Sequence, residues 1–147
     1  MRFFLFAAAL LLGFSLTAGV DFKAAEGSVT VKHPQFRCVV TSIGGQLSSF
    51  VTSHNQRELV NPSNPQIDGL GKVKDGLYAD ITPQLASFDL SVERKSADLV
   101  VVKASMLCNK AVFKGVKFLR TFVFDSSKNY VVVQESLEAV NAVAELY

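Results

Sequence analysis

Apolar and polar residues alternate along most of this chain, which is the period of a β-strand with one buried face. The clearest stretch spans 110–141 and predicts a long antiparallel hairpin. Its apolar positions share one face of each arm: Phe118, Phe122 and Phe124 before the turn, and Val131, Val133, Leu137 and Ala139 after it. The polar cluster 125–129 separates the two runs and predicts the turn.

Shorter alternating segments elsewhere predict further strands. They lie at 29–31, 36–50 (two strands), 57–60, 77–81, 88–93 and 99–108. Gly44-Gly45 predicts a tight turn within the second of these segments, because glycine reaches backbone angles closed to other residues. The segment 21–28 is expected to be a loose polar lead-in.

Sustained helical periodicity is absent beyond the N-terminus. About seven to nine strands with regular turn signals predict an all-β antiparallel sandwich.

The first residues predict a secretory signal peptide. Arg2 precedes an apolar run through Leu12, and small residues follow at 17–19. We therefore expect a signal peptide at 1–19, one β-sandwich domain at 20–147, and an exported protein, periplasmic or extracellular. The alternative is an uncleaved membrane anchor, since the apolar stretch is almost long enough to span a bilayer.

Composition limits the chemistry. The formal net charge of +2 in 147 residues leaves no electrostatic footprint for nucleic acid. Two cysteines, Cys38 and Cys108, either form a disulfide in an oxidising compartment or act as small buried thiols. Their spacing from the two histidines fits no zinc motif, and we expect neither a metal nor a cofactor.

Other polar residues offer candidate chemistry with plainer explanations. His33 and His54 are candidate general bases, but no nucleophile motif accompanies them, so solvent-exposed turns are favoured. Gly69-Leu70-Gly71 is interpreted as part of a flexible loop, because no helix follows whose N-terminus could bind a phosphate. The basic residues Lys110, Lys114, Lys117 and Arg120 predict a solvated sheet face.

The best candidate ligand-binding residues lie at the two ends of the loop 61–76. Asp75, Tyr78 and Asp80 cluster at its exit, and Arg57 precedes it. These side chains either line a polar carbohydrate site or decorate a solvated loop. The chain has no Trp to serve as a sugar platform.

Three segments resemble the galactose mutarotase-like β-sandwich superfamily. They are FRCVVTSIGGQLSSFVTSHNQRELVNP (36–62), DGLGKVKDGLYADI (68–81) and FLRTFVFDSSKNYVVVQESLEAVN (118–141). The same features also resemble the periplasmic domain of YidC-type membrane insertases, which shares that fold.

The resemblance implies an exported carbohydrate-binding domain. In full mutarotases the catalytic histidine and glutamate lie beyond the matched region, so no catalytic position is carried over and we expect this chain not to be catalytic by itself. A periplasmic protein-interaction domain of insertase type and a structural envelope domain are the alternatives. The resemblance further implies that this chain corresponds to the N-terminal portion of a larger sandwich, so we expect an open edge at 130–139 and self-association through it.

Overall fold

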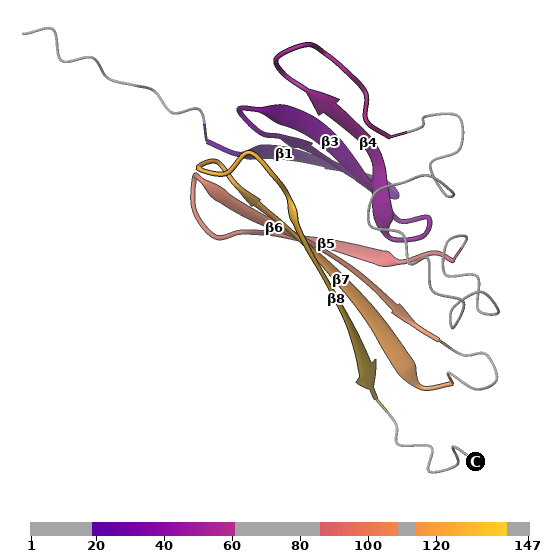
Figure 1. Cartoon of the computed structure of the whole chain (residues 1–147). Helices are drawn as coiled ribbons and strands as arrows, with labels where there is room; N and C mark the ends of the chain where they lie inside the picture. The colour runs from indigo at the N-terminus through magenta and orange to yellow at the C-terminus, as the bar shows by residue number, and fades with distance from the viewer. Residues whose placement is uncertain (1–18, 61–85, 109–113, 141–147) are drawn as a thin grey trace, which may run out of the picture.

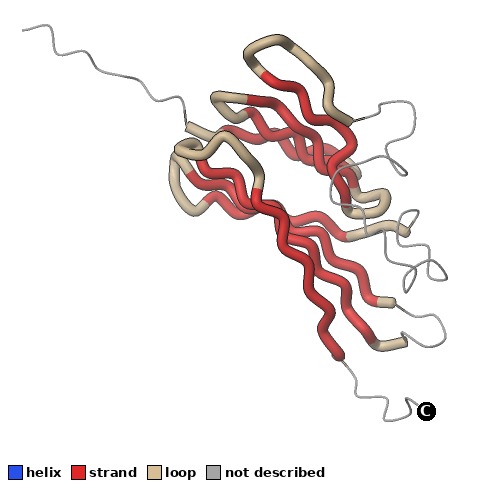
Figure 2. The backbone as a smooth tube through the Cα atoms, viewed as in Figure 1, coloured by secondary structure: helices blue, strands red, loops and turns tan. Residues whose placement is uncertain are grey.

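The computed structural model describes residues 19–60, 86–108 and 114–140 of the chain (Figure 1). Within these ranges the protein is all-β and has no helix (Figure 2). The described ranges therefore also hold no helix that could cross a membrane. The predicted signal peptide at 1–19 lies outside them, apart from its last residue.

Eight strands form two antiparallel sheets of four strands each, and strand order follows chain order in both. The N-terminal sheet contains β1 (Asp21–Ala25), β2 (Ser28–Lys32), β3 (Phe36–Thr41) and β4 (Gln46–Thr52). The C-terminal sheet contains β5 (Asp89–Arg94), β6 (Leu99–Leu107), β7 (Val116–Asp125) and β8 (Val132–Ala139). The prediction of an all-β antiparallel sandwich is confirmed at this level, because the described strands form two antiparallel sheets that face each other.

The core lies between the two sheets. Its fully buried side chains come from alternate positions of facing strands, which is the pattern that the sequence predicted. Among them are Val31, Cys38, Val40, Val100, Val102, Phe122 and Phe124. The sheets approach each other at one end, whereas the far ends of β7 and β8 run on past the N-terminal sheet (Figure 1).

The β3–β4 turn links the two sheets. Gly44 and Gly45 both have positive φ, 72° and 54°, as the predicted tight turn requires. The amide of Gly44 donates to Ala86 O at 2.8 Å, and a Cβ on Gly45 would come within 2.8 Å of the Phe88 ring. Only glycine therefore lets the turn contact the chain just before β5.

The prediction of a loose lead-in at 21–28 is wrong. Residues 21–25 form β1 and pair with β2 along its whole length. Arg94 holds β1 from the other sheet: its guanidinium donates to Val20 O at 2.9 Å and to Asp21 Oδ1 at 3.0 Å, and stacks over Phe22. These contacts come from residues distant in sequence, which local composition does not reveal.

The predicted strand at 57–60 is reduced to a single bridge between Val51 and Glu58. The Glu58 side chain replaces some of the backbone hydrogen bonds that a paired strand would make here. Its carboxylate accepts from the backbone amides of Phe50 and Val60 and from the Ser49 hydroxyl. Partial burial opposes ionisation of Glu58, but these hydrogen bonds outweigh it and lower the pKa of the carboxyl.

Candidate functional site

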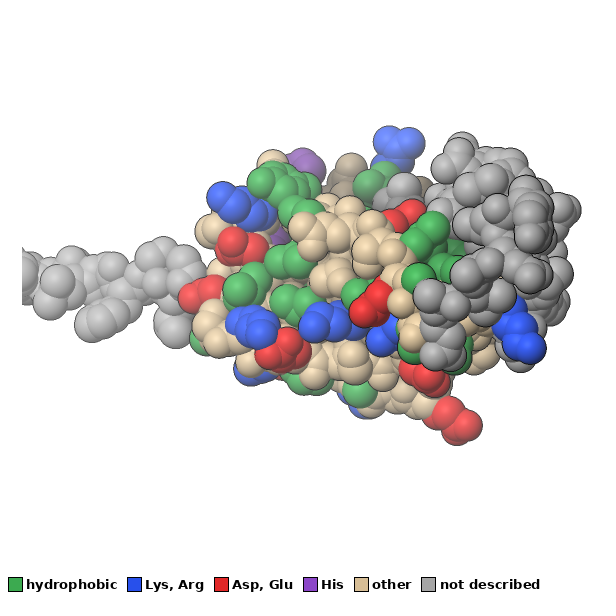
Figure 3. Space-filling model, turned by 90° about the horizontal axis from the view of Figure 1, so that it is seen from below, with side chains coloured by type: hydrophobic (Ala, Val, Ile, Leu, Met, Phe, Trp, Pro, Cys, Tyr) green, Lys and Arg blue, Asp and Glu red, His purple; other side chains and the backbone are tan. Residues whose placement is uncertain are grey.

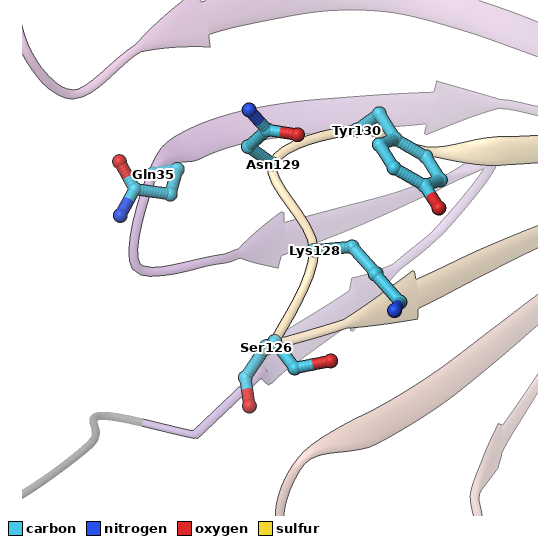
Figure 4. A pocket seen from close by; sticks show the side chains of 6 residues that line it. Gln35, Ser126, Lys128, Asn129 and Tyr130 are labelled. Atoms are coloured by element: carbon cyan, nitrogen blue, oxygen red, sulfur yellow. The ribbon is translucent and has the colours of Figure 1, made fainter.

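A polar hollow of about 380 Å³ opens where the β7–β8 turn passes the β2–β3 turn (Figure 4). We call it the turn hollow. Its lining residues are Gln35, Ser126, Ser127, Lys128, Asn129 and Tyr130. The side chains of Lys128 and Tyr130 point the same way from the turn (Figure 4), and Tyr130 leaves 52% of its surface exposed. The hollow therefore combines an accessible aromatic ring with several hydrogen-bonding groups.

Asp125 shapes the turn that carries most of these residues. Its carboxylate Oδ1 accepts from the Ser127 amide at 2.9 Å and from the Ser127 hydroxyl at 2.7 Å. Its backbone carbonyl accepts from the Lys128 amide at 2.9 Å. Both Ser127 hydrogen bonds favour the charged carboxylate, and they lower the pKa of Asp125. The turn is thus closed by a side chain that is ionised at neutral pH.

Contacts from both sheets fix the turn in place. Ser126 donates from its amide to Asp98 O at 2.9 Å and from its hydroxyl to Asp98 Oδ1 at 2.7 Å. On the other side, His33 Nε2 lies 2.9 Å from the backbone carbonyl oxygen of Asp125, and the backbone amide of Gln35 donates to His33 Nδ1 at 3.1 Å. Because Nδ1 accepts, this network assigns the proton to Nε2, which donates to Asp125.

The hollow offers the chemistry of polyol binding. The side-chain amides of Gln35 and Asn129 can each donate and accept hydrogen bonds. The two serines add hydroxyls, and the Lys128 ammonium adds three donors. The Tyr130 ring adds an apolar face with a polar tip. The fixed turn lowers the ordering cost of binding. No group of three or more His, Cys, Asp or Glu residues that could hold a metal occurs within the described ranges.

Only one of the four residues predicted to bind ligand, Arg57, lies within the residues that the structure describes. Arg57 is exposed in the turn after β4, where its carbonyl accepts from the Thr52 amide at 3.0 Å. That turn adjoins the hollow, because the Ser53 amide donates to Gln35 O, but Arg57 is not among the lining residues. Asp75, Tyr78 and Asp80, and the glycines of 69–71, lie outside the described residues.

Sequence reasoning identified the polar cluster 125–129 only as a turn and did not identify Gln35 or Tyr130 as site residues. Tyr130 carries a usable signal, since it is an aromatic residue placed directly after a turn cluster. Gln35 carries none, because its position beside the turn depends on how the two sheets pack.

The prediction that His33 is exposed to solvent is wrong. His33 is 6% exposed and stacks on Phe36, with 4.1 Å between ring centroids. It ties the β2–β3 turn to the end of β7, and this structural role explains its burial. His54 is exposed in a turn, as predicted.

The prediction of a solvated basic face is wrong for Arg120, which is 5% exposed. Its position on β7 puts it on the same face as Phe118 and Phe122, between the sheets. Its Nη1 donates to Gly44 O at 3.0 Å and to Gly45 O at 2.8 Å. Glu135 Oε1 lies 2.6 Å from Nε, an ion pair without the alignment of a hydrogen bond.

Burial lowers the pKa of the Arg120 guanidinium, and the Glu135 carboxylate opposes that shift. Of the other basic residues in the predicted face, Lys114 is exposed, Lys117 is partly exposed, and Lys110 lies outside the described ranges. Figure 3 shows basic and acidic side chains interleaved with apolar ones on one face of the molecule.

The two cysteines are both buried, Cys38 in the N-terminal sheet and Cys108 just after β6. Cys38 is a reduced thiol, and burial raises its pKa to about 12. This placement is that of a small apolar core residue, one of the two alternatives that the sequence left open.

No protein-family model matches this chain, and no curated protein matches it.

Proposed function

We propose that this chain is an exported, non-catalytic carbohydrate-binding domain and that the turn hollow is its sugar site. The observation that carries the proposal is an exposed tyrosine ring beside amide, hydroxyl and ammonium groups on a turn fixed by both sheets. The two-sheet β architecture and the sequence resemblance to mutarotase-like proteins support the same assignment.

Binding would use the two sides of a sugar differently. The C–H face of the ring stacks on Tyr130, while neighbouring hydroxyls exchange hydrogen bonds with Gln35 and Asn129. Lys128 donates to ring or hydroxyl oxygens and favours acidic sugars over neutral ones. Because the hollow is shallow and open, it suits one or two sugar units at the surface of a longer glycan.

The test is calorimetric titration of the purified protein with common monosaccharides and polysaccharides, repeated with Tyr130→Ala. We expect binding to weaken by about tenfold or more on loss of the ring, a change of about 1.4 kcal/mol. Leu107→Ala is the matched control, since Leu107 is similarly exposed at 56% but lies outside the hollow.

Each result decides one part of the proposal. Absence of binding to any of these sugars would overturn the function. Binding that survives Tyr130→Ala but is lost in Arg57→Ala would keep the function and move the site to the residues predicted from the sequence.

A further inference from the structure

All eight residues of β8 are exposed, although the strand pairs with β7 along its length. Apolar side chains on both of its faces are open to solvent, including Val132 at 40%, Val133 at 36% and Leu137 at 48%. Among the described strands, only β7 pairs with β8. Within the part of the chain that the structure describes, the strand therefore presents an unpaired backbone edge and uncovered apolar side chains.

The backbone directions at this edge follow from printed hydrogen bonds. The Val140 amide donates to Gly115 O on the β7 side at 2.9 Å, so even-numbered residues of β8 direct their backbone groups toward β7. The odd-numbered residues direct theirs to the open edge. These are Val133, Glu135, Leu137 and Ala139, and together they offer a regular row of donors and acceptors.

We propose that a second copy of this chain pairs with this edge, β8 against β8 in antiparallel orientation, so that one sheet runs through both copies. A two-fold axis makes the contact self-complementary, as in most homodimers. The proposal goes beyond sugar binding and does not depend on it.

The backbone directions select the register. Outward-pointing odd residues must face odd residues of the second copy, so the numbers of opposed residues add to an even total. The full-overlap register, which opposes Val132 to Ala139, violates this rule. The two nearest allowed registers place either Glu135 or Ser136 on the two-fold axis.

Charge decides between these two registers. A Glu135 axis opposes two carboxylates directly, which destabilises a strand pair. A Ser136 axis opposes Ser136 to itself, Val133 to Ala139 and Glu135 to Leu137. It also extends the pairing to Val132 against Val140. We therefore assign the Ser136 register.

The rest of β8 favours pairing. Proteins protect exposed edges with prolines, bulges or charged side chains, lysine above all; β8 contains no proline, lysine or bulge, and its two charged residues are glutamates. One of them, Glu135, forms an ion pair with Arg120 of the same chain but leaves 43% of its side chain exposed. The other, Glu138, points to the opposite face of the sheet.

Disulfide trapping tests the register. Even residues form the non-hydrogen-bonded pairs of the new interface, with opposed Cα atoms about 4.5 Å apart, a separation that a disulfide spans. Ser136→Cys should therefore give a covalent dimer under mild oxidation. Gln134→Cys is the matched control, because the two copies of residue 134 are offset by about 13 Å along the strands. Native Cys38 does not compete, since burial keeps it protonated.

A proline variant tests the edge itself. Leu137→Pro removes an amide that points outward and leaves the β7–β8 ladder intact. Leu137→Val keeps that amide and is its control. Sedimentation of the wild-type protein and of Leu137→Val at tens of micromolar should give dimers, and Leu137→Pro should weaken dimerisation at least tenfold.

Four results would overturn the proposal: a wild-type monomer at these concentrations, a dimer unaffected by Leu137→Pro, crosslinking through Gln134→Cys in preference to Ser136→Cys, or a monomer whose edge takes up an extended peptide from another protein. Circular dichroism of Leu137→Pro confirms that the strand content is retained.

Discussion

β7 and β8 are the two arms of one hairpin, and they differ completely in burial. Along β7, alternate side chains are buried, from Phe118 to Phe124. Along β8, every side chain is exposed. The two strands are in register over β8, with Phe122 opposite Val133 and Arg120 opposite Glu135.

The difference shows that alternation of apolar and polar residues predicts a strand, but does not predict whether another layer of the protein buries its apolar face. Both arms carry apolar residues on the face toward the N-terminal sheet. That sheet and its β3–β4 turn reach β7, where Arg120 contacts Gly44 and Gly45, and they stop short of β8. Burial therefore depends on the layer opposite, which is set by distant segments of the chain.

The largest expected effect comes from truncating the facing pair Phe122 and Val133. Phe122→Ala should lower the free energy of unfolding by about 3–5 kcal/mol, because it empties a fully buried position in the core. Val133→Ala should cost less than about 1 kcal/mol in a monomeric sample, since its side chain is 36% exposed. Urea denaturation at dilute protein measures both. Equal losses would contradict the contrast between the two strands.

The facing charged pair should show the same asymmetry at smaller size. Arg120→Ala removes a buried guanidinium together with its two hydrogen bonds, and should lower the free energy of unfolding by about 2–3 kcal/mol. Glu135→Gln should cost about 1 kcal/mol or less, because Arg120 keeps its carbonyl acceptors and the Glu135 side chain is 43% exposed. Urea denaturation of each variant is the measurement. A greater loss in Glu135→Gln would mean that the ion pair, rather than the Gly44-Gly45 turn, holds Arg120.

The smallest effect concerns the turn that joins the two arms. Since the folded state lowers the pKa of Asp125, the stabilisation from its carboxylate is complete above the ordinary pKa of about 4 and is lost as pH falls through the lower folded value. Asp125→Asn keeps an acceptor oxygen for Ser127 but cannot titrate, so the stability difference from wild type should shrink as the solution is acidified.

Thermal unfolding of wild type and Asp125→Asn between neutral pH and about pH 3 measures this change. Subtracting the two curves removes the titration of other carboxylates, such as Glu58. A difference that does not vary with pH would show that the Ser127 hydrogen bonds do not depend on the charge.

Much of the fold could be predicted from the sequence, because its cause is local. The period of two residues specified β2 to β8, and Gly44-Gly45 specified their turn. β1 could not be predicted, since it contains one large apolar residue, Phe22, and is held by Arg94 from the other sheet.

The candidate site was harder to predict. Its turn was visible as a polar cluster, but the approach of Gln35 and the burial of His33 depend on how the sheets pack. Arg120 was assigned to solvent because a charged residue in an alternating strand is usually on the wet face. Only the carbonyls of a turn 75 and 76 residues earlier make its burial favourable.

The chain-order arrangement of strands in both sheets has a consequence for folding. Each sheet is a meander of neighbouring strands, so its pairing requires only short loops to close and can form rapidly. The contacts between sheets, such as Arg120 with Gly44, join residues 76 positions apart, about half of the chain length, and carry the entropic cost of a long loop. We therefore expect docking of the two meanders, completed by the contacts at the glycine turn, to be the step that limits the folding rate.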